Sequence, residues 1–169
     1  LQPETRLQKE PIEKWNPMLI EGANTRKIRP SLYDLLANRA LQYFMQAENY
    51  TPEPAYKFVI NDARFLADVQ TFIALPISTK DTSSLQLKTL KLFQNLLAFQ
   101  VSKKNDAALT EINLDRLEYV YNQAAFPGKM EAYEKSLLAI YKNNKIPELV
   151  AGAGYRLANL YFTKGNEYE

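Results

Sequence analysis

Apolar residues recur every three or four positions in most of the chain from residue 31 to residue 165, which is the period of amphipathic helices. The first such stretch is "PSLYDLLANRALQYFMQAE", in which Ser31 can cap a helix and Asp34 follows three residues later. The stretch therefore predicts a helix. The apolar residues expected on its buried face are Leu32, Leu35, Leu36, Ala40, Tyr43 and Phe44.

The next stretch has a different pattern. In "YTPEPAYKFVIND" two prolines interrupt the helix, and the alternation of Tyr56, Phe58 and Ile60 indicates a brief extended segment. The following "DARFLADVQTFIA" predicts one short helix that ends before Pro76.

Residues 83–165 predict four successive helices joined by short loops. Pro147 suits the first turn of the last helix, and Gly165 suits the position just past its end. Short loops place consecutive helices antiparallel, so these helices are expected to form stacked hairpins. The four stretches are "SLQLKTLKLFQNLLAFQVS", "NDAALTEINLDRLEYVYNQAA", "MEAYEKSLLAIYKNN" and "PELVAGAGYRLANLYFTK".

Residues 1–30 hold four of the nine prolines, which predicts an extended arm with at most a short helical turn. Because the arm carries an apolar cluster in its middle, we expect it to pack across the domain. The chain thus divides into an arm, residues 1–30, and a single all-α domain, residues 31–169. The cluster consists of Trp15, Met18, Leu19 and Ile20.

The helical hairpins suggest an irregular array of tetratricopeptide type. Two helix starts lie about 43 residues apart, whereas strict tetratricopeptide spacing is 34. The last helix fits the first-helix pattern of that repeat at Leu157 and Tyr161, although Ala158 stands where glycine is usual and Gly154 replaces the tryptophan.

The candidate interaction site lies on this last helix. In tetratricopeptide geometry Tyr155, Asn159 and Phe162 would face a concave groove. Packing against a further helix explains these residues equally well. We expect the turn and the second arm, beginning near Gly165 and Tyr168, to continue in a longer parent chain.

The composition excludes several kinds of partner and of catalytic or metal site. A content of 46% hydrophobic and 24% charged residues is that of an ordinary globular protein, and a net charge of +2 offers no attractive field for nucleic acid or an anionic membrane. Because cysteine and histidine are both absent, thiol nucleophiles, imidazole bases and Cys/His zinc sites cannot be built. We therefore predict no catalytic, cofactor or metal site, and a membrane contact only through an anchor outside this chain.

Two carboxylate pairs, Asp62 with Asp68 and Asp115 with Glu118, could in principle serve acid–base chemistry. A hydrolase that uses carboxylates alone is thus a third, minor function class. Solvated helix faces carry carboxylates at such spacings, and we favour that interpretation.

The glycines of "AGAG", residues 151–154, lie within a helical pattern and lack a preceding strand, so they indicate helix packing rather than a phosphate loop. The basic clusters "TRKIR", residues 25–29, and "KK", residues 103–104, lack interleaved aromatic residues, so we interpret them as solvated loop charge.

Four long segments together resemble the helical N-terminal region of bacterial alpha-2-macroglobulin-like proteins of the Bacteroidetes type. They are "WNPMLIEGANTRKIRPSLYDLLANRALQYF", "ISTKDTSSLQLKTLKLFQNLLAFQ", "INLDRLEYVYNQAAFPGKMEAYEKSLLAIY" and "YRLANLYFTKGNEYE". The resemblance covers nearly the full chain. No thioester residue can be carried over, because the chain has no cysteine.

The resemblance implies a non-enzymatic helical scaffold or interaction module in the periplasm or cell envelope, within a large parent that acts in some relatives as a protease inhibitor. Its partners would be other domains of the same parent chain, and proteases or envelope proteins through that parent. The alternative is a free-standing, tetratricopeptide-like adaptor that binds a peptide in the groove of Tyr155, Asn159 and Phe162.

Overall fold

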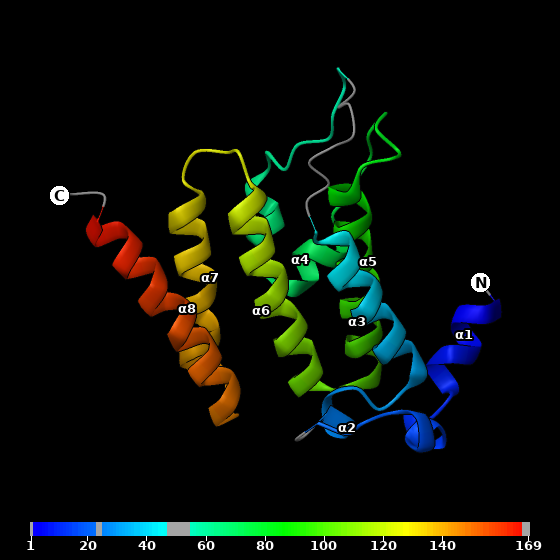
Figure 1. Ribbon diagram of the computed structural model, residues 1–169. Helices are drawn as coiled ribbons and strands as arrows, with labels where there is room; N and C mark the ends of the chain where they lie inside the picture. The colour runs from blue at the N-terminus through cyan, green and yellow to red at the C-terminus, as the bar shows by residue number, and fades with distance from the viewer. Residues whose placement is uncertain (1, 23–24, 47–54, 167–169) are drawn as a thin grey trace.

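The computed structural model describes residues 2–22, 25–46 and 55–166, and within these ranges the chain forms helices joined by loops, with no strand (Figure 1). The all-α class predicted from the sequence is therefore confirmed. The helices are α1 (Gln2–Lys9), η1 (Ile12–Met18), α2 (Thr25–Ile28), α3 (Leu32–Phe44), η2 (Ala63–Leu66), α4 (Val69–Ala74), α5 (Leu85–Lys103), α6 (Asp106–Gln123), α7 (Lys129–Asn143) and α8 (Pro147–Asn166).

Polar side chains fix where the long helices begin. The backbone N–H of Asp34 donates to the Ser31 hydroxyl at 3.2 Å, and the Asp34 carboxylate accepts from the Ser31 N–H at 3.0 Å, which is the capping box that the sequence predicts. Asn105 caps α6 by accepting from the Ala108 N–H at 3.2 Å. Just before it, Lys104 adopts a left-handed conformation with φ of 55°, so the chain reverses between α5 and α6.

The long helices lie side by side in a row that runs from α1 through α3, α5, α6 and α7 to α8, with α8 at the edge (Figure 1). The short elements η2 and α4 pack against α5, α6 and α7. The core between them is closed by side chains with no exposed surface, namely Phe72, Leu90, Phe93, Leu96, Leu97, Leu117, Val120 and Leu137.

Consecutive helices contact each other within the pairs α5–α6 and α7–α8, as expected for helical hairpins. The helix α8 also contacts α6. A tetratricopeptide-like superhelix stays a prediction, because these contacts alone do not define a repeat.

The buried face of α3 is not the one that its apolar pattern predicts. Leu36 is 46% exposed and Tyr43 is 60% exposed, whereas the face turned inward carries Tyr33, Asp34, Ala37, Asn38 and Leu41. The helix is rotated because Asp34 serves the core: its carboxylate accepts from Gln100 of α5 at 2.6 Å as well as from Ser31. The inward face thus includes a buried carboxylate with its hydrogen-bond partners, and Leu36 lies outside it.

The N-terminal arm also differs from the expectation, because its extended character is not confirmed. Residues 2–9, 12–18 and 25–28 are helical; Pro3 lies in the first turn of α1 and Pro17 inside η1, whereas Pro11 and Pro30 lie between helices. Ile12 is 2% exposed, and its N–H donates to the Pro30 carbonyl at 3.0 Å. Trp15, Met18 and Ile20 of the predicted apolar cluster are exposed.

Two smaller predictions, of one helix near residues 62–74 and of a helix end before Gly165, were wrong in detail. The single helix predicted near residues 62–74 is divided into η2 and α4, because Asp68 caps the second piece by accepting from the Thr71 N–H at 3.0 Å. Residues 57–60 of the predicted extended segment lie outside any helix, and Phe58 and Ile60 are buried there, whereas Tyr56 is exposed. Gly165 lies inside α8 rather than past its end. The predicted turn at Tyr168 lies outside the described residues.

Candidate functional site

The three residues predicted to form an interaction site lie on one face of α8. Tyr155 is 68% exposed and Phe162 is 72% exposed, and Asn159 between them is also exposed. The spacing i, i+4, i+7 brings them together on the helix surface. We define the outer face of α8 as Ala151, Tyr155, Ala158, Asn159, Phe162 and Gly165.

The opposite face of α8 is buried. Leu149, Ala153, Leu157 and Leu160 are each at most 9% exposed, and they turn toward α6 and α7. The glycines of "AGAG" belong to this packing: a Cβ atom on Gly154 would lie 3.2 Å from the Tyr141 ring. Helix packing is therefore the role of these glycines, as the sequence analysis favours.

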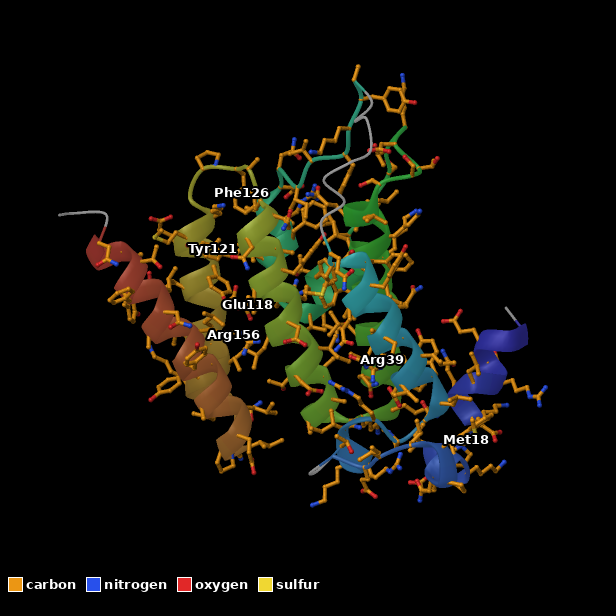
Figure 2. All side chains as sticks on the ribbon, in the orientation of Figure 1. Met18, Arg39, Glu118, Tyr121, Phe126 and Arg156 are labelled. Atoms are coloured by element: carbon orange, nitrogen blue, oxygen red, sulfur yellow. The ribbon has the colours of Figure 1, made fainter. Side chains whose placement is uncertain are left out.

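The charged residues within α8 are held against its neighbours. Arg156 donates from Nε to Glu118 at 2.7 Å and from Nη2 to Asp115 at 3.0 Å, so one guanidinium joins α8 to two carboxylates of α6. Figure 2 shows Arg156 and Glu118 lying between the two helices. Lys164 lies 2.5 Å from Glu134 of α7. These ion pairs direct the positive charge away from the outer face.

Asp115 and Glu118 thus share one cation, the guanidinium of Arg156, and we interpret the three groups as a structural ion pair between α6 and α8. Burial between α6 and α8 raises the pKa of Asp115 to about 6, with a further rise from Glu111 and Glu118, while Arg156 and Arg29 oppose the rise. Asp115 and Glu118 face a hollow of about 280 Å³ beside Met45 and Tyr119. Since both carboxylates are engaged by Arg156, no free acid and base are brought together there.

The other carboxylate pair is separated into two helix caps. Asp62 accepts from the Arg64 backbone at 2.8 Å, and hydrogen bonds from Arg64 lower the pKa of Asp62. Asp68 accepts from the Thr71 hydroxyl and N–H, and these bonds lower the pKa of Asp68. Both groups are committed to the starts of η2 and α4.

The basic clusters are also engaged in the fold. Arg29 pairs with Glu111 of α6 at 3.2 Å, and Arg26 donates to Asn16 and lies 3.7 Å from Glu21. Lys104 ends α5. The Arg29–Glu111 pair ties the N-terminal arm to α6, whereas the contacts of Arg26 lie within the arm.

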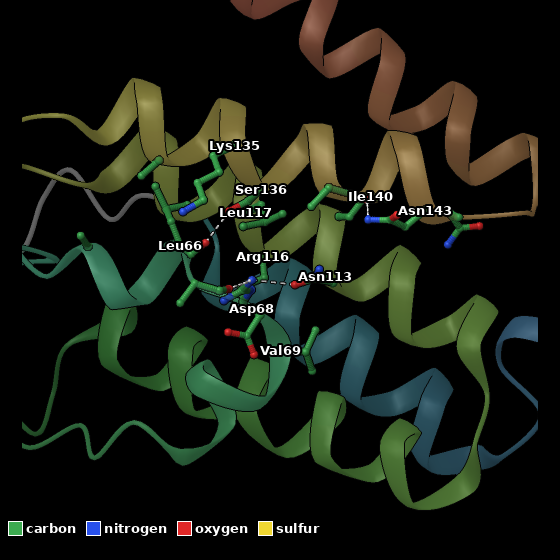
Figure 3. A pocket seen from close by; sticks show the side chains of 15 residues that line it. Leu66, Asp68, Val69, Asn113, Arg116, Leu117, Lys135, Ser136, Ile140 and Asn143 are labelled. Atoms are coloured by element: carbon green, nitrogen blue, oxygen red, sulfur yellow. Dashed lines mark hydrogen bonds between the residues drawn. The ribbon is translucent and has the colours of Figure 1, made fainter.

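A feature that the sequence did not indicate is an open pocket of about 620 Å³ lined by η2, the start of α4, α6 and α7 (Figure 3). The guanidinium of Arg116 lies in its wall with no exposed surface. It donates to the carbonyls of Phe65 at 3.1 Å and Ala67 at 2.8 Å and to Asn113 at 2.7 Å. Ser136 donates to the intervening carbonyl of Leu66 at 2.7 Å.

Three successive carbonyls at the end of η2 are therefore satisfied by side chains of α6 and α7. Burial lowers the pKa of Arg116 to about 9, so the group is still charged at neutral pH. Its guanidinium also lies over the Phe72 ring at 4.4 Å. The pocket wall is thus a structural junction. A sequence signal was available only in the polar residues Asn113 and Arg116, spaced three apart within an apolar helix pattern.

Among the described residues, no three His, Cys, Asp or Glu side chains converge in a way that could hold a metal ion. Within the same ranges, no helix combines the length and apolar character needed to cross a membrane. No family model, curated protein or solved structure matches this chain.

Proposed function

We propose that this chain is a non-enzymatic helical scaffold or interaction module that docks a helical neighbour on the outer face of α8. One observation supports this most directly: Tyr155 and Phe162 expose 68% and 72% of their surface on a helix whose other side is fully packed. Exposed aromatic residues that gather on one face are typical of protein–protein contacts.

The charge distribution supports an apolar neighbour. Between Glu148 and Lys164 the sequence has one charged residue, Arg156, and its guanidinium is bound to α6. A charged peptide would find no complementary group along this face. A helix with an apolar stripe would bury the two aromatic rings without burying an unpaired charge.

The wider setting that we propose is a large alpha-2-macroglobulin-like protein of the cell envelope, in which the module braces neighbouring domains. Its support is the resemblance carried by the four sequence segments. An antibody against the chain, used on fractionated cells, tests this setting: we expect a band far above 19.5 kDa in the envelope fraction. A cytosolic band near 19.5 kDa would reject the macroglobulin setting.

The alternative function is a free-standing adaptor that binds an extended peptide. It is favoured by Asn159, whose exposed side chain between Tyr155 and Phe162 could pair with a peptide backbone. A peptide-library screen tests it, with Thr163→Ala as a control on the same helix. Binding that survives Tyr155→Ala and Phe162→Ala together would reject this groove.

A further inference from the structure

The outer face of α8 contains a regular seam that repeats every seven residues. We define the seam as Ala151, Tyr155, Ala158, Phe162 and Gly165, which alternate steps of four and three residues. All five are exposed. This is the spacing of the contact positions in a coiled coil, and here a small residue alternates with an aromatic one.

The seam lies on the side of α8 opposite to its contacts with the rest of the domain. The buried positions Leu149, Ala153, Leu157 and Leu160 point to α6 and α7, about half a helical turn away from the seam. A Cβ atom placed on Gly165 would meet no atom within 4 Å. The seam is thus open along the length of the helix, and its small residues permit a close approach of another helix.

The order of small and large residues in the seam is complementary to itself when the direction is reversed. The midpoint of α8 lies between Arg156 and Leu157. Full antiparallel overlap of two such helices places Ala151 opposite Phe162 of the second copy and Tyr155 opposite Ala158. Two-fold symmetry repeats both pairings, so four central layers each combine one aromatic and one small residue.

A parallel arrangement lacks this complementarity. It would place Tyr155 against its own counterpart and Ala158 against its own counterpart, so crowded layers would alternate with empty ones. In the antiparallel arrangement, opposed helix dipoles add a small favourable term.

We propose that the occupant of this seam is a second copy of the same chain, paired antiparallel through α8 in a two-fold dimer. This inference rests on the proposed function, since it names the partner of the same face. A helix of 20 residues is ~30 Å long, so the contact falls in the lower size class of specific interfaces. We therefore expect a dimer that dissociates on dilution.

Analytical ultracentrifugation of the whole chain tests the proposal, from ~1 µM to ~1 mM. We expect the mass to rise from 19.5 kDa toward twice that value with concentration. Ala158→Glu, at the centre of the seam, should weaken dimerisation at least tenfold. Thr163→Glu introduces the same charge on an exposed position outside the seam and should leave it unchanged; circular dichroism checks that both variants fold.

Because the chain has no cysteine, its orientation can be tested with two introduced thiols. An oxidised mixture of the Ala151→Cys and Phe162→Cys chains should give a disulfide-linked heterodimer, whereas Ala151→Cys alone should not link to itself. Self-linking of Ala151→Cys would overturn the antiparallel arrangement.

A chain that stays at 19.5 kDa up to ~1 mM would overturn the inference of a second copy. That result would not reject the outer face as a docking surface for another helix. Failure of the docking function itself would be seen separately: Tyr155 and Phe162 would then be oxidised by hydroxyl radicals to the same extent in the cell and in the isolated chain.

Discussion

Buried polar residues set the orientation of several elements in this molecule. Asp34 and Arg116 have no exposed surface and Gln100 is 1% exposed, yet each has hydrogen-bond partners in the core. Their side chains join elements that are distant in sequence, since Gln100 reaches Asp34 and Arg116 reaches the carbonyls of η2. Pairs of this kind cannot be predicted from one helix pattern, because the pattern says nothing about which helix lies opposite.

Replacing Arg116 by Met should destabilise the protein, by about 1–3 kcal/mol for each buried acceptor left without a donor, because the carbonyls of Phe65 and Ala67 and the amide oxygen of Asn113 lose their hydrogen bonds. Urea unfolding followed by circular dichroism measures the change. The control is Arg39→Met on the exposed side of α3, which should stay within about 0.5 kcal/mol. Equal effects of the two substitutions would contradict the junction described for Arg116.

Asp115 makes stability depend on pH in a defined direction. Its pKa is raised to about 6 from 3.8, so the folded state holds the proton more tightly than the unfolded state. The contribution is fully present below pH ~3.8 and is lost as the pH rises through about 6. Asp115→Asn should therefore raise stability at pH 7 relative to the wild type and should flatten the fall between pH 4 and pH 7.

The measurement is the free energy of unfolding of both proteins at several pH values in that window. Glu131→Gln on the exposed start of α7 serves as a control for the loss of one carboxylate. A wild type whose fall in stability matches that of Asp115→Asn would show that Asp115 does not titrate there.

At the scale of the elements, the positions of the long helices could be predicted because local signals agree with one another. The period of apolar residues, the caps at Ser31 and Asn105, and Pro147 at the start of α8 all lie near the observed boundaries. The rotation of α3 could not be predicted, because its inward face includes Asp34 and Asn38. A count of apolar residues selects the wrong side of such a helix.

The observed rotation of α3 changes the expected effect of truncating its leucines. Leu41→Ala should cost about 2–5 kcal/mol, since Leu41 is 3% exposed within the core. Leu36→Ala should cost well under half of that, because Leu36 is 46% exposed. Thermal or urea unfolding of both variants measures the difference. A larger loss of stability for Leu36→Ala would contradict the observed orientation of α3 and favour the one that its apolar pattern predicts.

At the scale of the whole molecule, the structure is a row of helices with α8 at its edge, packed on one side and open on the other (Figure 1). The candidate residues Tyr155, Asn159 and Phe162 were predicted from the sequence on the basis of tetratricopeptide geometry, in which they would face a concave groove. What covers them could not be deduced from the sequence, because an aromatic residue serves a core, a groove or an interface equally well. Docking is favoured because the rings of Tyr155 and Phe162 are exposed while the opposite side of α8 is already packed against α6 and α7.

The central claim is that the outer face of α8 is covered in the working protein. Hydroxyl-radical footprinting tests it most directly, by comparing oxidation of Tyr155 and Phe162 in intact cells with oxidation in the dilute isolated chain. Tyr43, 60% exposed on α3, is the internal reference. We predict that Tyr155 and Phe162 are several-fold less oxidised in cells relative to Tyr43. Equal relative oxidation in the two settings would contradict the claim.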